Sequence, residues 1–130
     1  GDNVNAASRL EGLTRVYKIP GICSKFVMND IKNNVSDHGI EFYEIDTVQV
    51  KGKTTGKKVF WPITRELFTE DLKKQMTDFQ IGLEQYYNGN WPEANQSFNK
   101  CSLPLAEVFK FRTQETCPDN WNGIWQMQTK

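Results

Sequence analysis

The spacing of apolar residues changes about half-way along this chain of 130 residues, and that change constrains the fold more than any other feature. Residues 40–50, which alternate in their second half, and residues 57–63 are rich in β-branched and aromatic side chains, which is typical of strands. Residues 69–88 instead carry apolar side chains three and four positions apart, which predicts a helix of about 20 residues. That stripe consists of Leu72, Met76, Phe79, Leu83 and Tyr86 with Tyr87. We therefore expect an α+β fold, mixed in residues 1–63 and mostly helical in residues 64–130.

Two details of the strand region refine this expectation. The alternation within residues 40–50 changes phase near Asp46 and Thr47, and the intervening KGKTTG holds two glycines, so a hairpin is predicted. Pro62 has no N–H to give to a sheet, which places it at a sheet edge or at the end of its strand.

The region before the hairpin is predicted to be mixed. Residues 3–17 have the apolar spacing of a helix, which Pro20 and Gly21 would stop. Residues 22–27 are an apolar run that predicts a short strand. Residues 29–35 predict a brief helix capped by Asn29.

The residues after the long helix predict a helical hairpin. Further helices are expected to begin near Pro92 and Pro104, because proline suits the first turn of a helix. Gly82 and Ala94 are small and would let two antiparallel helices approach closely. Three aromatic residues would fill the space between them: Tyr86, Trp91 and Phe98. We expect this hairpin to pack on the sheet or on a second subunit, and the tryptophan-rich end to be a short strand or a docked tail.

Composition excludes several function classes. The chain carries 16 basic and 16 acidic residues, which excludes a broadly basic wrapper of nucleic acid. It has no apolar run long enough to span a bilayer, so no transmembrane segment is predicted. Lysines gather at one place, around Lys51, Lys53, Lys57 and Lys58, which is typical of a solvated hairpin and would also suit a phosphate site.

The cysteines favour a reducing compartment. Cys23, Cys101 and Cys117 are odd in number and widely spaced, and His38 is the one histidine that could join them at a metal. A structural zinc or a disulfide framework is therefore not expected. We predict three free thiols, a cytoplasmic location, and Cys23 as a small core residue.

The first eleven residues, GDNVNAASRLE, carry the clearest chemical signal. Asn5 and Arg9 are four apart, so on a helix they would lie one turn apart on one face. An amide and a guanidinium aimed at one point can clamp hydroxyl and phosphoryl oxygens, which suits a phosphoryl transition state. An Asn and Arg pair without flanking signals is more often surface decoration.

The flanking residues resemble the GDxVNxASRLE signature of class III nucleotide cyclases, the adenylate and guanylate cyclases. The resemblance implies that Asn5 orients the ribose and that Arg9 stabilises charge developing on the α-phosphate. The family also has a VKGK turn downstream, matched by residues 50–53. It implies that Lys51, or alternatively Lys53, contacts the nucleotide phosphates. The fold implied is part of a ferredoxin-like cyclase sheet with its helices.

The second half also resembles bacterial members of this family. Many of them follow the catalytic domain with GLxxYxxGxWxxAxxxF, matched from Gly82 to Phe98, and finish near PPxxWDGVWxLxxK, matched from Pro118 to Lys130. The first pattern is similar to a tetratricopeptide repeat. The resemblance divides the chain into residues 1–63, the C-terminal half of a catalytic domain, and residues 64–130, a TPR-like helical extension.

The resemblance implies an enzymatic activity for a longer parent protein, of which this chain would be a part. Family members convert ATP or GTP to a 3′,5′-cyclic nucleotide and pyrophosphate, as homodimers with Mg²⁺ or Mn²⁺ held by two aspartates. Those aspartates, and the base-selecting residues, precede the motif, so no metal ligand is expected here. We expect a parent that is cytoplasmic or anchored through upstream segments, and a 130-residue chain that is inactive alone. The alternatives are a dimerisation or protein-interaction module and a degenerate cyclase-like regulatory domain.

Overall fold

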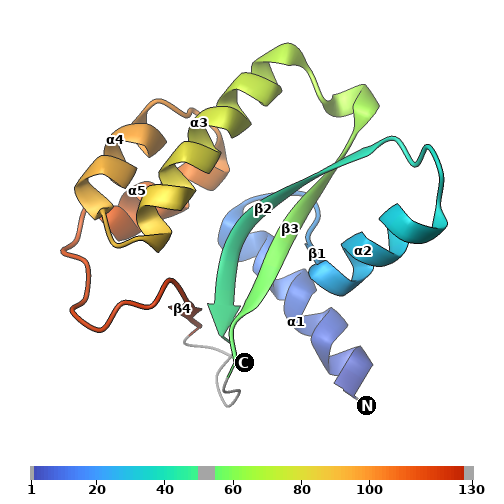
Figure 1. Cartoon of the computed structure of the whole chain (residues 1–130), viewed down its shortest axis with the longest axis horizontal. Coiled ribbons are helices and arrows are strands. Elements are labelled where there is room, and N and C mark those ends of the chain that lie inside the picture. Colours follow the sequence, from blue (N-terminus) through green and yellow to red (C-terminus); the bar gives the residue numbers. More distant parts are fainter. Residues whose placement is uncertain (1, 50–54, 128–130) are drawn as a thin grey trace.

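The structure, a computed structural model, describes residues 2–49 and 55–127, with side chains described from Leu10 onward in the first helix. It has an α+β fold, as predicted. The elements in chain order are α1 (Asp2–Tyr17), β1 (Cys23–Ser24), α2 (Lys25–Asn34), β2 (Ile40–Gln49), β3 (Lys57–Thr64), the 3₁₀ turn η1 (Arg65–Leu67), α3 (Glu70–Tyr87), α4 (Trp91–Asn99), α5 (Pro104–Thr113) and β4 (Trp125–Gln126). In this described part the strands form one mixed sheet in the order β1-β3-β2-β4 (Figure 1).

The antiparallel pair β2 and β3 is the centre of the sheet. Its register pairs Tyr43 with Trp61 and then shifts between Glu44 and Asp46, so that Ile45 is an extra residue on β2. This β-bulge is the phase change predicted near Asp46, and it lets two consecutive residues, Ile45 and Asp46, both be buried. The bulge therefore turns a charged side chain into the core.

Pro62 lies inside β3 rather than at its end. β1 runs beside Val59 and Phe60, whereas Pro62 pairs with Phe42 of β2. At Pro62 the described part of the sheet has a strand on one side, so the local position is an edge and a residue without an N–H is tolerated there.

The start of α2 differs from the prediction. A strand over residues 22–27 was expected, but β1 is Cys23–Ser24 and α2 begins at Lys25, four residues before the predicted cap Asn29. The reason is local, because the Ser24 hydroxyl accepts a hydrogen bond from the Val27 N–H at 3.2 Å and caps the helix. The Phe26 side chain is 80% exposed, so it does not pack in the core of the sheet.

The helices α3 and α4 form the predicted hairpin. A Cβ atom built on Gly82 would lie 2.7 Å from the Phe98 ring, so these helices approach as closely as a glycine allows. Ala94 and Phe98 are fully buried. The TPR-like character of this hairpin stays a prediction.

The two halves of the chain share one core. Its main cluster joins Leu13 and Tyr17 of α1, Ile45 of β2, and Phe79 and Phe109 of α3 and α5. The helices α3, α4 and α5 lie on one side of β2 and β3, and α2 lies on the other (Figure 1). The helical half thus packs on the sheet of its own chain, which was one of two predicted arrangements. The division at residues 63 and 64 stays a prediction.

The segment after α5 returns to the sheet. β4 pairs in parallel with β2, Trp125 opposite Val48 and Gln126 opposite Gln49. The end of the described chain is therefore both a short strand and a docked tail. No helix in residues 2–49 and 55–127 combines the length and apolar character needed to cross a membrane.

Candidate functional site

The helix α1 carries the predicted pair Asn5 and Arg9. Both positions are helical, as predicted, and lie one turn apart. The same four-residue spacing continues to Leu13 and Tyr17, which are both buried. Each four-residue step advances only about 40° around a helix, so positions 5 and 9 continue the row that faces the core at the other end of α1. The side chains of residues 1–9 lie outside the described part of the structure.

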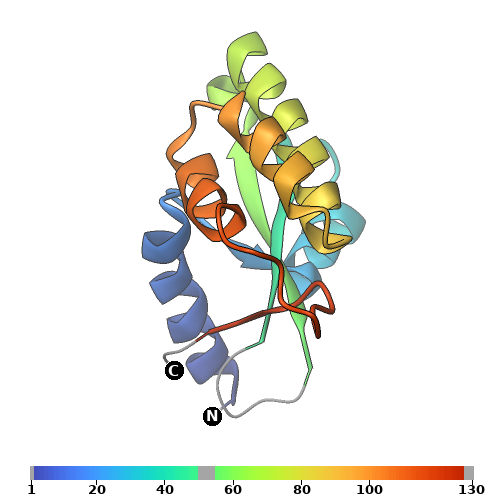
Figure 2. The same ribbon diagram turned by 90° about the vertical axis from the view of Figure 1, so that its left-hand side faces the viewer.

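The predicted phosphate ligands Lys51 and Lys53 also lie outside the described residues. The strands that flank them are described, since β2 ends at Gln49 and β3 begins at Lys57. Both views place the start of α1 and this end of the β2 and β3 pair at the same end of the molecule (Figures 1 and 2). The backbone therefore brings the two predicted halves of the site toward one end, and the roles of the four side chains stay predictions.

A buried ion pair joins β2 to α5. The Arg112 Nη1 atom lies 2.7 Å from the Asp46 Oδ2 atom. Arg112 is 5% exposed and Asp46 is fully buried. A buried charge without a partner would be costly, so each residue requires the other.

Two tyrosines complete this buried polar cluster, which consists of Tyr17, Asp46, Tyr86 and Arg112. The Tyr17 hydroxyl donates to Asp46 Oδ2, and Arg112 Nη2 donates to the Tyr17 hydroxyl at 3.3 Å. Arg112 Nη1 also donates to the Tyr86 hydroxyl at 3.1 Å. The second carboxylate oxygen of Asp46 accepts from the Thr47 N–H at 2.8 Å. Among the described side chains, no buried nitrogen or oxygen lacks a hydrogen-bond partner.

The cluster has perturbed titration. Burial raises the pKa of Tyr17 and Tyr86 above the ordinary range, and the neighbouring Asp46 charge raises it further. Burial also raises the pKa of Asp46, against the opposing charge of Arg112. Burial alone would lower the pKa of Arg112, but Asp46 and the two phenols outweigh it and raise that pKa, so the guanidinium stays charged. The cluster therefore serves as a fixed link among α1, β2, α3 and α5.

The returning tail covers this cluster. The Trp125 ring centre lies 3.8 Å from the Arg112 guanidinium carbon, and the Phe109 ring centre lies 4.8 Å from the same carbon. Such stacking suits the planar, weakly hydrated guanidinium. The Trp121 N–H donates to the backbone carbonyl of Tyr86 at 2.9 Å, which fastens the tail to the end of α3.

Sequence reasoning missed Asp46 and Arg112 as partners. One signal was present at each: the phase change near Asp46, and a single arginine on the buried side of a helix. Neither signal says which residue the other charge would meet. The pairing depends on the tertiary fold.

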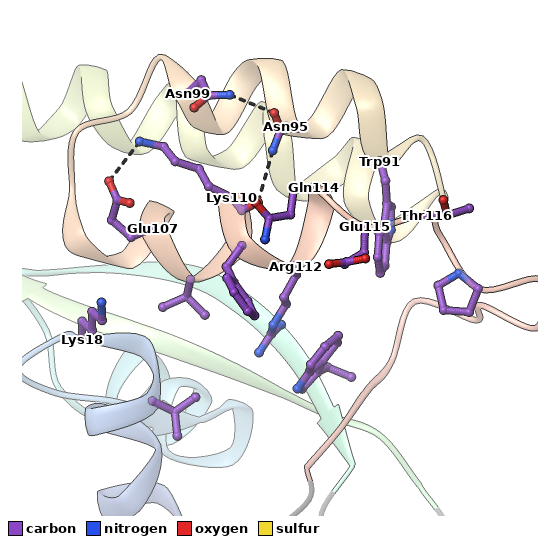
Figure 3. Close-up of a pocket in the computed structure, with 15 residues that line it drawn as sticks. Lys18, Trp91, Asn95, Asn99, Glu107, Lys110, Arg112, Gln114, Glu115 and Thr116 are labelled. Carbon is purple, nitrogen blue, oxygen red and sulfur yellow. Dashed lines mark hydrogen bonds and ion pairs between the residues drawn. The ribbon is translucent and has the colours of Figure 1, made fainter.

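A groove of about 1020 Å³ lies beside the cluster, between the end of α1 and α5 (Figure 3). Figure 3 shows Lys18 on one side and Glu107 with Lys110 on the other. Phe111, which is 70% exposed, also lines it. The lining mixes apolar and oppositely charged side chains and therefore favours no one ligand class.

In residues 2–49 and 55–127, no group of three or more His, Cys, Asp or Glu side chains could hold a metal ion. The buried Asp46 is engaged by Arg112 and Tyr17. The described residues therefore do not fit Mg²⁺ or Mn²⁺. The three cysteines are free, and Cys23 is buried, as predicted for a core residue.

The chain is similar to an adenylate cyclase of Dictyostelium discoideum. It is 29% identical over 104 residues to the protein described as adenylate cyclase, terminal-differentiation specific, of Dictyostelium discoideum. The match covers 78% of this chain, which spans 5% of the length of that relative. No family model matches the chain. No solved structure matches it either. The similarity supports a relationship to adenylate cyclases.

Proposed function

We propose that this chain is part of an adenylate or guanylate cyclase and supplies the residues that bind the ribose and phosphates in the transition state. The observation that carries the proposal is the pair Asn5 and Arg9, one turn apart on α1 within the GDxVNxASRLE pattern. The similarity to the adenylate cyclase of Dictyostelium discoideum supports it.

The proposed reaction is an internal phosphoryl transfer. The ribose 3′-hydroxyl loses its proton and attacks the α-phosphorus, a new P–O bond closes the 3′,5′ ring, and the bond to pyrophosphate breaks. Asn5 holds the ribose so that the 3′ oxygen faces the phosphorus. The Arg9 guanidinium stabilises the negative charge that builds up on the α-phosphate oxygens. Lys51, or alternatively Lys53, neutralises the departing phosphates as a point charge on a long stem.

The remaining parts of the proposed site belong to other residues of the whole protein. Mg²⁺ or Mn²⁺ would neutralise phosphate charge and would be held by carboxylates outside the described part of this chain. A homodimer would place those carboxylates of one subunit against Asn5 and Arg9 of the other. ATP or GTP is the proposed substrate, and the base preference is not assigned.

The test is substitution of Arg9 in the complete protein that carries this chain. Arg9→Ala is expected to lower kcat more than about 100-fold, because it removes a contact made chiefly in the transition state. Arg15→Ala is the matched control, because Arg15 is an exposed residue of the same helix. Its substitution removes the same positive charge. Equal activity of the two variants, with both folded, would reject the proposal and favour an assembly module or a regulatory domain.

A second experiment uses the 130-residue chain by itself. Purified and supplied with ATP or GTP and Mn²⁺, it is expected to form no cyclic nucleotide, because it lacks the proposed metal carboxylates. Turnover that increases with chain concentration would contradict this division of the site.

A further inference from the structure

We propose that Arg112 is a positioning residue for the nucleotide site: through the buried polar cluster it fixes α1 against β2, and so sets the first turns of α1, which carry positions 5 and 9, relative to the end of β2 at Gln49 and the start of β3 at Lys57. The inference rests on the proposed function, which gives those residues their roles. It makes the helical half of the chain a part of the active-site framework.

The first step is the anchoring of α1. Its last residue, Tyr17, is fully buried and contacts both members of the ion pair through its hydroxyl. Its ring also stacks with Phe109 of α5 at 6.0 Å between ring centres. The C-terminal end of α1 is therefore held by α5 and β2 together.

The second step is leverage along the helix. Arg9 lies eight residues before Tyr17 and Asn5 lies twelve before it. At 1.5 Å of rise per residue, a tilt of about 5° at Tyr17 would move position 5 by about 1.6 Å. A misplacement of about 1 Å in a phosphoryl-transfer site can lower the rate about 100-fold. Small changes at the cluster therefore have large expected effects at the other end of α1.

The third step is that β2 shares the same anchor. Asp46 is held by Arg112 Nη1 and by the Tyr17 hydroxyl, and it stands five positions before Lys51. The bulge at Ile45 is what turns Asp46 inward. One guanidinium thus fixes the two elements that carry the proposed ribose and phosphate contacts.

The fourth step is that the geometry requires an arginine. One nitrogen reaches Asp46 and Tyr86, and the other reaches Tyr17, while the face of the group stacks on Trp125. A lysine ammonium is a point charge and cannot span these partners in a fixed plane. Arg112→Lys should therefore keep the charge and lose the alignment.

The central test variant combines Arg112→Met with Asp46→Asn. The double change removes the link but leaves no unpaired buried charge, and the amide still offers an acceptor to Tyr17. In the complete protein, this variant is expected to keep its melting temperature within a few degrees. Its kcat should fall about 10- to 100-fold with little change in KM. Arg112→Lys should likewise lower kcat with little change in KM.

A distance measurement checks the alignment without any activity. Spin labels at Gly12→Cys on α1 and Lys57→Cys on β3, in a Cys117→Ser background, report the placement of one element against the other. Gly12 has open space around it and Lys57 is exposed, so both sites accept a label. The double variant should broaden or shift the distance distribution in the 130-residue chain. Phe111→Gln, an exposed neighbour on α5, is the matched control for distance and for kcat.

The outcomes separate this inference from the proposed function. The positioning role alone is overturned if Arg9→Ala is inactive while the double variant keeps its label-to-label distance or its kcat unchanged. Arg9→Ala that is fully active rejects the proposed function, and the positioning role falls with it. A shifted distance together with a lowered kcat at constant KM supports the inference.

Discussion

The guanidinium of Arg112 lies 2.7 Å from the carboxylate of Asp46, although 66 residues separate them in the chain. The pair joins the bulged strand β2 to the last helix α5, and neither residue has significant exposure to water.

The first prediction concerns the energy of the ion pair. Arg112→Met is expected to lower the free energy of unfolding by about 3–5 kcal/mol, because it leaves Asp46 buried without its partner. Adding Asp46→Asn should recover most of that loss, which additive effects would not. Urea unfolding followed by tryptophan fluorescence measures all four corners of this cycle. Strictly additive changes would contradict a direct interaction.

The second prediction compares two helical glycines. Gly82→Ala should lower stability by about 1–3 kcal/mol, because the new methyl group would collide with the Phe98 ring. Gly12→Ala should instead raise stability by about 0.5–1 kcal/mol, because nothing lies within 4 Å of its Cβ position and alanine favours the helix. Thermal unfolding of both variants tests the close approach of α3 and α4. A shift of the same sign in both would refute it.

The third prediction concerns the tail. Trp121→Phe should lower the free energy of unfolding by about 1 kcal/mol, because it removes the N–H donated to the Tyr86 carbonyl. Trp61→Phe is the control, since Trp61 also packs on the core but its N–H has no partner among the described residues. An equal loss in both variants would mean that ring packing, and not the hydrogen bond, fastens the tail.

The fourth prediction is a loss of stability at high pH. Burial, reinforced by the Asp46 charge, raises the pKa of Tyr17, Tyr86 and Tyr87 above the ordinary value of about 10. The folded chain keeps these protons while the unfolded chain releases them above that pH. Their contribution is therefore complete below pH ~10 and falls as the pH rises, by up to about 1.4 kcal/mol per group and pH unit.

Tyrosinate absorbance recorded together with circular dichroism tests this fourth prediction. The three tyrosines should ionise together with unfolding. Reversible ionisation of all three near pH ~10 in the folded chain would contradict their burial.

The elements that follow from local spacing were predictable. The stripe of α3, the close approach of α3 and α4 at Gly82, and the phase change near Asp46 each depend on residues near one another in sequence or on a simple period. The predicted start of α2 was wrong, because the apolar character of Phe26 suggested a strand. Capping by Ser24 and the short reach of β1 favoured a helix instead.

The candidate site divides in the same way. The positions of Asn5 and Arg9 on a helix followed from their spacing, and the structure has that helix. The link from Arg112 to Asp46 and Tyr17 could not be predicted, because a single sequence does not say which distant residues share a buried space. Composition gave no help either, since a neutral chain can keep its charges on the surface or pair them inside.

The residues of the buried cluster are synthesised at widely separated times. Tyr17 and Asp46 leave the ribosome long before Arg112, which stands 95 and 66 residues after them, and Trp125 emerges later still. Until Arg112 emerges, the Asp46 carboxylate lacks its positive partner, so burying it in the core is unfavourable. Closure of this core should therefore wait until α5 has emerged, and a ribosome that stalls before residue 112 would expose a product with an incomplete core.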